Sequence, residues 1–548
     1  MRNFLVHAKK TWLQISCRRK ILIIIFLSLL IIGLVLSVSN IYQKFTVIQP
    51  KEGGTLKLGI IGHPLYINPV LSSGNDCDNK LEELIYNGLY SVDGKGNLIP
   101  QLAKKTEISP DGKTYTIFLK NNVLWHDGVK FTADDVIFTI QTIQNPKFKS
   151  PLYLNWTGVT VEKIGKDIIR FRLSNPYHPF LQNLTLKIIP AHIWKNIPPE
   201  LFPLAQYNLK PIGTGPYIFD NLEKTKRGEI TSYTLAANKN YFAGPAKIEH
   251  LILRFYNSYQ QAKRGLLKGE IDGLSPLAPQ DVNFFQSKRN FQIQRLELPR
   301  YYAVFFNLNK NIFTKEVREA LDLSISRSQL IKEVLNNQAL PLSYPISPGF
   351  WGSINATNDY SSQQARNLLK KEITNGNSLH FTLTLPDDPQ LVKVASFLKK
   401  SWQGIGVRTE LQILPLDTLE KDIIPHRSYE ALLFGEIVGQ DPDLFSFWHS
   451  SQAISPGLNL SAYRNQNLDK LLEETRQISD ENKRKENIIL IQKILGKDKP
   501  AIFLYNPYVL YLLPSSVKGN SVRRANYPAE YLADINHWYI YTSRHLHF

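Results

Sequence analysis

The stretch WHDGVKFTADDVIFTIQTIQNP, residues 125–146, shows how this chain is built. Thr132 and Asp135 have the spacing of a capping box, in which each side chain accepts a hydrogen bond from the other residue's backbone N–H. Apolar residues then recur at helical spacing. Pro146 ends the pattern, because proline lacks an N–H and its ring clashes with the preceding turn. These residues predict a helix with one buried face.

The residues in front of this helix, Trp125 to Gly128, predict a tight hairpin turn. His126 and Asp127 adjoin in it, but neighbours on a turn point in different directions, so we interpret them as structural rather than catalytic. A second glycine motif, Gly213-Thr214-Gly215, lacks the lysine and the following helix of a phosphate loop. We interpret it as a turn into a strand.

Strands and helices alternate outward from this stretch through both halves of the chain. Asn79 and Glu82 predict a second capping box, and Ser258 an N-cap for a helix over 259–268. Alternating apolar residues predict strands at 55–60, 114–120 and 251–256. No repeat of fixed period is present. The pattern favours α/β lobes over a solenoid or a propeller.

The N-terminal region has the form of a membrane anchor. Six lysines and arginines precede the uncharged segment Ile21 to Ser39, with no acidic residue among them. This segment is long enough to span a bilayer, and the basic flank places the N-terminus in the cytoplasm. The alternative is a cleaved signal peptide, since Ser37-Val38-Ser39 has the small-x-small form that signal peptidases cut. Either interpretation places the rest of the chain outside the cytoplasm.

The net charge of +18 does not indicate nucleic-acid binding, because the basic residues are spread along the chain without a dense block or a reading motif. A basic surface facing anionic lipid or cell wall fits better. Cys17 and Cys77 flank the apolar segment and are expected to be free thiols. The sequence contains no HExxH, no GxSxG and no spaced ligand set, so we expect no metal, no cofactor and no catalysis.

Several motifs, taken together and in order, resemble the family 5 extracellular solute-binding proteins, the oligopeptide- and dipeptide-binding group of ABC importers. The motifs span roughly residues 53–520, and their order makes them far more specific than any one piece. They are Gly53-Gly54-Thr55-Leu56, Ile85-Tyr86-Asn87-Gly88-Leu89-Tyr90, Trp125-His126-Asp127-Gly128, Pro211-Ile212-Gly213-Thr214-Gly215-Pro216-Tyr217, Gly269-Glu270-Ile271-Asp272 and Asp441-Pro442-Asp443.

The resemblance implies an α/β fold: a two-lobed periplasmic-binding-protein clamp with an extra domain on lobe I, preceded by one N-terminal transmembrane helix. Such lobes close on a solute by hinge motion. The implied segments are 1–20 cytoplasmic, 21–42 anchor or signal, 43–52 tether, 53–91, 211–308 and 515–548 domain I, 92–210 domain II, and 309–514 domain III.

In peptide binders of this family the ligand backbone pairs like an added strand with two protein segments. Here they correspond to Ser73-Gly74-Asn75-Asp76 and to Phe434-Gly435-Glu436-Ile437-Val438. An aspartate four residues before the proline of the second segment holds the ligand's α-ammonium in these binders, but counting back from Pro442 gives Val438. Glu436, two residues away on the same strand face, is the expected substitute, and a slip of one or two residues in the alignment is the alternative.

Other side chains complete the expected pocket. Tyr301, Tyr302 and Trp351 are candidates to line it, each equally suited to the core, and Asp441 either caps the following turn or contacts the ligand.

The leading hypothesis is an oligopeptide-binding component of an ABC importer, a monomer whose main protein partner is a membrane permease. Because Val438 removes the charge, a second hypothesis is a ligand without a free amine, such as an oligosaccharide or a metal chelate. A third is a surface scaffold or sensor that uses the same clamp without transport. A hydrolase is the fourth and has no sequence feature in its favour.

Overall fold

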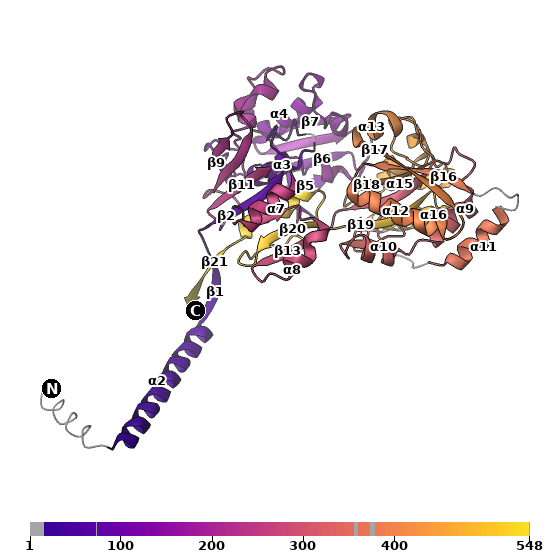
Figure 1. Cartoon of the computed structure of the whole chain (residues 1–548). Helices are drawn as coiled ribbons and strands as arrows, with labels where there is room; N and C mark the ends of the chain where they lie inside the picture. Colours follow the sequence, from indigo (N-terminus) through magenta and orange to yellow (C-terminus); the bar gives the residue numbers. More distant parts are fainter. Residues whose placement is uncertain (1–15, 73, 356–359, 373–378, 547–548) are drawn as a thin grey trace.

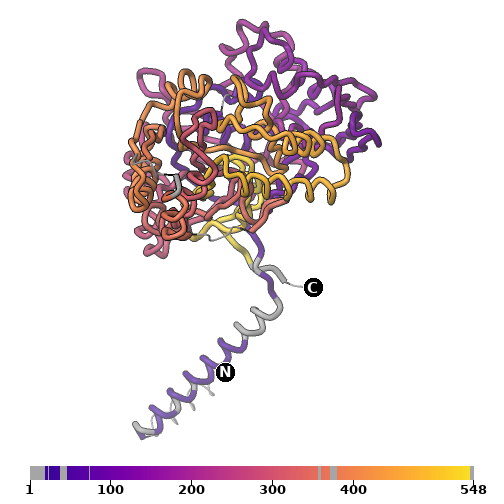
Figure 2. Tube along the Cα trace, turned by 90° about the vertical axis from the view of Figure 1, so that its right-hand side faces the viewer, coloured from indigo at the N-terminus to yellow at the C-terminus, as the bar shows by residue number. Residues whose placement is uncertain are grey.

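The computed structural model describes residues 16–72, 74–355, 360–372 and 379–546. Two α/β lobes lie side by side, and one long helix projects from the first lobe (Figure 1). The predicted two-lobed architecture is confirmed. The view turned by 90° shows both lobes above the projecting helix (Figure 2).

Lobe I is built on a mixed seven-stranded sheet. Its strands, in spatial order, are β13 (Phe291–Leu296), β20 (Val509–Pro514), β12 (Gly273–Ser275), β2 (Thr55–Ile61), β11 (His250–Tyr256), β10 (Ile230–Ala237) and β9 (Tyr217–Lys224). The central strand β2 pairs in parallel with both of its neighbours, and the outer strands pair antiparallel. The strands predicted at 55–60 and 251–256 therefore lie side by side.

The helices of lobe I include α3 (Asp76–Ile85), α7 (Tyr259–Leu267) and α8 (Val282–Gln286). Ser258 caps α7 as predicted, its side chain accepting from the N–H of Gln261. The predicted capping box at Asn79 is wrong. Helix α3 begins one turn earlier, because the side chain of Asn75 accepts from the N–H of Cys77 and performs the cap there.

The part of lobe I that the sequence assigned to domain II carries its own four-stranded antiparallel sheet. This sheet consists of β5 (Ala103–Ile108), β6 (Thr114–Leu119), β8 (Ile168–Leu173) and β7 (Val159–Gly165). The same region holds the ribbon β3 (Tyr90–Val92) and β4 (Leu98–Pro100), and the helices α4 (Ala133–Gln144), α5 (Phe180–Asn183) and α6 (Ala191–Trp194). Helix α4 starts with the predicted box: the carboxylate of Asp135 accepts from the N–H of Thr132 at 2.8 Å.

The two glycine motifs of the sequence contact each other. Trp125 to Gly128 forms the predicted turn, with the Gly128 N–H donating to the Trp125 carbonyl at 2.9 Å. The half-buried ring of His126 accepts from the Gly213 N–H at 3.2 Å, and its other nitrogen lies 3.1 Å from the Gly215 carbonyl. Burial lowers the pKa of His126 to about 4, so the ring is neutral at physiological pH. This histidine joins two segments of lobe I and has a structural role.

Lobe II is built on a six-stranded mixed sheet: β15 (Ala339–Pro341), β19 (Ala501–Pro507), β14 (Arg300–Phe306), β18 (Ala431–Ile437), β16 (His380–Pro386) and β17 (Arg408–Leu414). Successive residues of β14 enter two different apolar cores, so this sheet is buried on both faces. Its helices are α9 (Lys315–Leu323), α10 (Arg327–Glu333), α11 (Ser362–Glu372), α12 (Pro389–Gln403), α13 (Leu416–Thr418), α14 (Phe445–Trp448), α15 (Gln466–Gln477) and α16 (Glu481–Asp498).

The chain crosses between the lobes twice, once between β13 and β14 and once between β19 and β20. The crossings fall at residues 297–299 and at Tyr508, whereas the sequence placed the boundaries at 308 and 514. The difference arises because apolar strands continue on both sides of each crossing, and strand patterns do not show which sheet a strand joins.

Helix α2 (Cys17–Phe45) leads into a two-stranded ribbon below lobe I (Figure 1). The strand after the helix, β1 (Thr46–Lys51), pairs antiparallel with the last strand, β21 (Tyr541–Leu546). Among the residues that the structure describes, α2 contains the one stretch, Arg19–Ser37, that is long and apolar enough to cross a membrane.

Candidate ligand-binding site between the lobes

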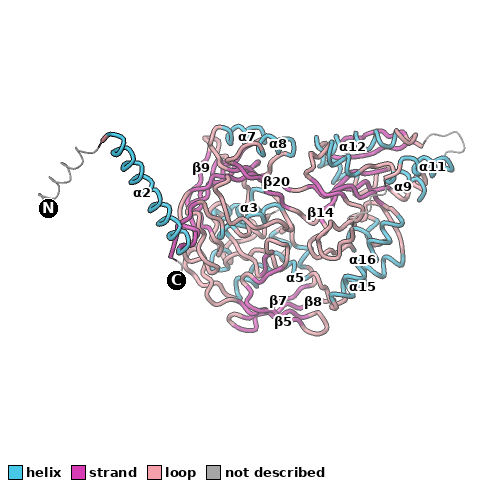
Figure 3. The backbone as a smooth tube through the Cα atoms, turned by 90° about the horizontal axis from the view of Figure 1, so that it is seen from below, coloured by secondary structure: helices cyan, strands magenta, loops and turns pink. Residues whose placement is uncertain are grey.

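The two lobes touch where the loop before α5 meets α15. The Tyr177 hydroxyl donates to Oδ2 of Asp443 at 3.2 Å, and Arg476 of α15 donates to the same oxygen at 2.8 Å. The His178 N–H donates to the Arg476 carbonyl at 3.1 Å, while its ring Nδ1 lies 3.4 Å from Oδ2 of Asp441. Seen from below, α5 lies beside α15 and α16 (Figure 3). Two aspartates of lobe II are thus the main acceptors at this contact.

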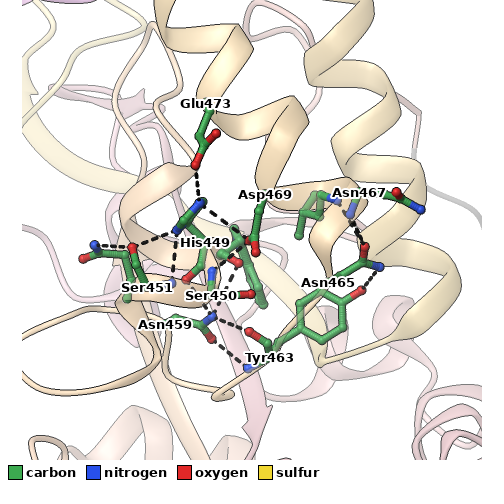
Figure 4. A network of polar contacts seen from close by, with 12 residues as sticks. His449, Ser450, Ser451, Asn459, Tyr463, Asn465, Asn467, Asp469 and Glu473 are labelled. Carbon is green, nitrogen blue, oxygen red and sulfur yellow. Dashed lines mark hydrogen bonds and ion pairs between the residues drawn. The ribbon is translucent and has the colours of Figure 1, made fainter.

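A polar network fixes the segment that leads into α15 (Figure 4). The Asn459 amide donates to the carbonyls of His449 at 3.2 Å and Tyr463 at 2.9 Å. The Ser450 N–H donates to Oδ1 of Asp469, on α15, at 2.8 Å. These bonds hold α15, and with it Arg476, in position against lobe I.

The same network places a histidine between a serine and a carboxylate, a grouping that also occurs in hydrolases. Nδ1 of His449 lies 2.8 Å from Oγ of Ser451 and accepts from the Ser451 N–H, while Nε2 lies 3.2 Å from Glu473. The ring therefore caps the short helical turn Ser450–Ala453. We interpret this grouping as a helix cap.

A first cavity, the cross-lobe cavity, has a volume of about 560 Å³ and is lined by both lobes. Lobe II contributes a segment around Trp351 together with Gln440, Asp441, Glu481, Arg484 and Lys485. Lobe I contributes Lys95, Gly96, Asn97, His178, Gln182 and Arg524.

A second cavity, the lobe I cavity, has a volume of about 320 Å³. Its lining side chains come from the loop before α3, from α3 itself, and from residues 152–187 of the same lobe. The polar ones include Ser72, Asn79, Glu82, Gln182, Lys187 and Tyr527. Because Gln182 lines both cavities, the two are neighbours in the region where the lobes meet.

The most deeply buried of the basic groups that line the cross-lobe cavity is Arg484. Its side chain is almost fully buried, its guanidinium lies 4.5 Å from the ring centre of Trp351, and it forms an ion pair with Asp441. Burial lowers the pKa of Arg484 to about 10, so the guanidinium remains charged at neutral pH. Its Nε has no hydrogen-bond partner within the described part of the chain. Trp351 and Asp441, both predicted from the sequence, thus line this cavity.

The acidic group of the lobe I cavity is Glu82. Only 7% of this residue is exposed, and its Oε1 has no hydrogen-bond partner among the described residues. Burial and the neighbouring Asp78 raise the pKa of the Glu82 carboxyl well above its usual range. The adjacent Glu83 differs, because its carboxylate accepts from Lys187 at 2.9 Å and from the Tyr527 hydroxyl at 3.0 Å. A buried carboxyl with one unsatisfied oxygen, Oε1, therefore lies at the wall of this cavity.

The first predicted segment lies partly at the lobe I cavity. Gly74 lines it with a left-handed backbone, φ +88°. Asn75 is the cap of α3, and Asp76 pairs with Lys80 one turn further along the helix. Ser73 lies outside the described residues.

The second predicted segment lies on β18 and the residue that follows, and most of it is covered. Glu436 stands opposite Tyr301 on β14 and accepts a hydrogen bond from its hydroxyl. Tyr301 is fully buried against Phe305 and Phe503. Burial raises the pKa of Glu436 to about 8, so this carboxyl is largely protonated at neutral pH. Neither Glu436 nor Tyr301 lines the two cavities described above.

The remaining residues of that segment alternate as a strand should. Val438 is 6% exposed and packs in an apolar core of lobe II, and Phe434 packs against the same core. Ile437 points the other way and is 57% exposed. Gly435 leaves room for the ring of Tyr302, which stacks on Tyr505 at 5.3 Å between ring centres.

Sequence reasoning missed Glu82, Lys187, Gln182 and Arg484. Glu82 was assigned to a helix cap, which hid its role at the cavity wall. The other three carry no local signature, because they meet at the cavities only through the packing of distant segments. The adjacent acids Glu82 and Glu83 were the signal that the sequence offered for this cavity. Both lie on a mostly buried helix, and a buried carboxylate needs a polar partner, so at least one of the two was expected to face a polar site.

The architecture, two α/β lobes joined by two crossings with polar cavities where they meet, defines the class of solute-binding clamp proteins. The family model described as "Bacterial extracellular solute-binding proteins, family 5 Middle" matches residues 97–455. The chain therefore belongs to this family of extracellular solute-binding proteins.

Individual relatives cover almost the whole chain. The oligopeptide-binding protein AppA of Bacillus subtilis is 26% identical over 95% of this chain and 99% of its own. Its structure in complex with a nonapeptide has a TM-score of 0.70 and covers 90% of this chain and 100% of AppA. The dipeptide-binding protein of Escherichia coli is 25% identical over 86% of this chain and 93% of its own length.

A relative with a different ligand is equally similar. NikZ of Campylobacter jejuni, solved in complex with Ni(L-His), is 28% identical with a TM-score of 0.71. The match covers 88% of this chain and 99% of NikZ. Two similar structures thus hold different ligands, a nonapeptide in AppA and Ni(L-His) in NikZ.

Proposed function

We propose that this protein is the extracytoplasmic solute-binding component of an ABC importer, and that it binds oligopeptides between its lobes and delivers them to a membrane permease. Membership of the family and the likeness to AppA support the transport role. The observation that carries the peptide assignment is the pair of complementary polar groups in neighbouring cavities, the buried carboxyl of Glu82 in one and the guanidinium of Arg484 in the other. A peptide with free ends presents the complementary ammonium and carboxylate groups.

The protein acts without catalysis, as a monomer that α2 anchors to the outer face of the cell membrane. The basic N-terminal flank and the apolar stretch Arg19–Ser37 support this topology. The mass of the protein isolated from native membranes tests the anchor. We expect a mass that includes residue 1, whereas a mass beginning after Ser39 would replace the anchor with a cleaved signal.

The proposed ligand class is tested by native mass spectrometry of the full-length chain released from detergent, after expression in a rich medium. We expect a ladder of co-purifying peptide masses. A single mass that is not a peptide would contradict the assignment.

The second candidate function is binding of a metal chelate in the same clamp. Val438 favours it, because the position where related peptide binders hold the ammonium is apolar and buried here. The likeness to NikZ also supports it. In the native mass spectrometry experiment, chelate binding predicts an increase in the mass of the protein that disappears when a strong chelator is added.

A further inference from the structure

Helices α7 and α8 form a basic surface on lobe I, the lobe from which α2 projects. Both helices pack on the lobe I sheet over one shared apolar core. Lys263 of α7 joins them, because its ammonium donates to Oδ1 of Asp281, the residue before α8, at 2.6 Å. The α7–α8 surface is the outward side of these helices together with the residues up to 290, and its cations are Lys263, Arg264, Lys268, Lys288 and Arg289.

Few carboxylates balance these cations. Asp281 is buried and also accepts a hydrogen bond from the Tyr259 hydroxyl at 2.6 Å. Glu270 lies 4.0 Å from the ammonium of Lys268. Within the described chain, the cations of this surface form two ion pairs, one with each of these acids. The surface therefore keeps a net positive charge.

Two large apolar side chains lie among the cations. Phe284 is 44% exposed, and the ammonium groups of Lys288 and Lys263 lie 4.8 Å and 5.7 Å from the centre of its ring. Leu267, the last residue of α7, is 53% exposed and follows Lys263 by one helical turn. Exposed apolar side chains among cations are typical of helices that lie in the headgroup region of a membrane, where lysine stems extend to keep their charge in water.

The α7–α8 surface lies on the side of lobe I toward which α2 leans. Figure 1 shows α8 at the lower end of lobe I, the end that carries the ribbon of β1 and β21. In the view from below, α7, α8 and the N-terminal end of α2 all lie toward the top (Figure 3). The two views agree, so a membrane that holds α2 lies on the side of these two helices.

We propose that the α7–α8 surface docks on the anionic lipid headgroups of the membrane in which α2 is anchored. A lipid layer matches both parts of the surface, because its phosphates attract the cations and its acyl boundary accepts Phe284 and Leu267. The inference goes beyond the proposed function and rests on the anchor proposed there. Docking makes lobe I the fixed half of the clamp and leaves lobe II free to move.

The test uses the full-length chain reconstituted in lipid nanodiscs. One set of discs contains phosphatidylcholine alone, and the other contains phosphatidylcholine and phosphatidylglycerol in equal parts. The measurement is hydrogen–deuterium exchange of the backbone amides over residues 259–290. We expect this segment to exchange at least about three-fold more slowly in the anionic discs, because docking suppresses local opening, and the difference to shrink as salt screens the charges.

Charge reversal tests the cations. The double variant Arg264→Glu, Lys268→Glu reverses two exposed charges one helical turn apart and should abolish the difference between the discs. The matched control is Lys493→Glu, Lys497→Glu, because these cations are exposed with the same spacing on α16. Helix α16 lies toward the opposite side of the view in Figure 3, so the control should retain the full difference.

A second pair of variants tests the apolar part. Phe284→Ser should reduce the difference about two-fold, because the ring no longer enters the acyl boundary. Leu490→Ser on α16 is its control, since Leu490 has a similar exposure of 46%, and it should change nothing. Unfolding midpoints of all variants separate a loss of docking from a loss of folding.

Three results would overturn the inference. Equal exchange of the wild type in both kinds of disc excludes docking on anionic lipid, and protection of the same segment in native membranes would then assign the surface to a membrane protein. Loss of the difference in the α16 charge variant would make it an effect of net charge. If the discs do not retain the chain, the proposed anchor falls together with the inference.

Discussion

Glu82 in lobe I and Glu436 in lobe II are equally buried, and each has one carboxylate oxygen without a hydrogen-bond partner among the described residues. They differ in what they face. Glu82 lines a cavity, whereas the other oxygen of Glu436 bonds to Tyr301 inside an apolar core. The comparison teaches that burial and a raised pKa alone do not identify a binding group. Access to a cavity separates a carboxyl that can receive a ligand from one that belongs to the core.

The largest expected effect concerns the dependence of stability on pH. The pKa of Glu436 is about 8 in the fold against 4.5 when unperturbed, so the folded state binds more protons between these values. The free energy of unfolding therefore falls as pH rises through this window, by up to about 4 kcal/mol. Glu436→Gln should make the thermal midpoint less dependent on pH between 5 and 8. An unchanged slope would mean that Glu436 is not buried as described.

The next prediction places a charge at Val438, the position that the family resemblance implies for the ammonium-binding aspartate. Val438→Asp should lower the free energy of unfolding by roughly 3 kcal/mol, because an unpaired polar group enters an apolar core beside Glu436. It should not improve peptide affinity. Val438→Asn, which has the same shape without charge, is the control. Tighter peptide binding by the aspartate variant alone would return the ammonium site to lobe II.

A smaller effect is expected from removing the hydrogen bond that Tyr301 donates to Glu436. Tyr301→Phe deletes the hydroxyl that donates to this carboxyl and should cost about 2 kcal/mol in unfolding free energy. Peptide affinity should be unchanged, since Tyr301 lines neither cavity. Denaturation and binding measured on one preparation check both statements. A fall in affinity without a fall in stability would place Tyr301 at the ligand.

The smallest effect lies at the contact between the lobes. Tyr177→Phe removes one hydrogen bond to Asp443, while Arg476 still pairs with that residue. We expect the dissociation of bound peptide to accelerate by a few-fold, corresponding to about 1 kcal/mol. Thermal stability should hardly change. An unaltered dissociation rate would show that this contact does not contribute to the closed state.

Much of the fold could be predicted from local patterns. The capping box at Thr132 and Asp135, the turn at 125–128 and the strand near 251–256 depend on residues close in sequence, and the structure contains all three. The start of α3 was misplaced, because two asparagines one turn apart offer the same capping chemistry.

The site was harder to predict, because its parts meet only in the folded chain. Trp351 and Asp441 come to the cross-lobe cavity, but Tyr301 and Glu436 face the core. Strand alternation places Glu436 and Val438 on one face but does not say whether that face meets solvent or another layer. Here both faces of the sheet are covered, and only tertiary packing decides this.

The ribbon of β1 and β21 has a consequence for reach. With α2 in a bilayer as proposed, the strand that leaves the membrane helix and the last strand lie side by side in this ribbon. Six paired residues at about 3.3 Å each make the ribbon short, and the pairing makes it stiffer than a single extended strand. A flexible linker would allow the lobes a wide range of positions, whereas this ribbon keeps them close to the lipid surface. The effective concentration of the lobes toward a neighbouring membrane partner is then high, and exchange with distant partners is restricted.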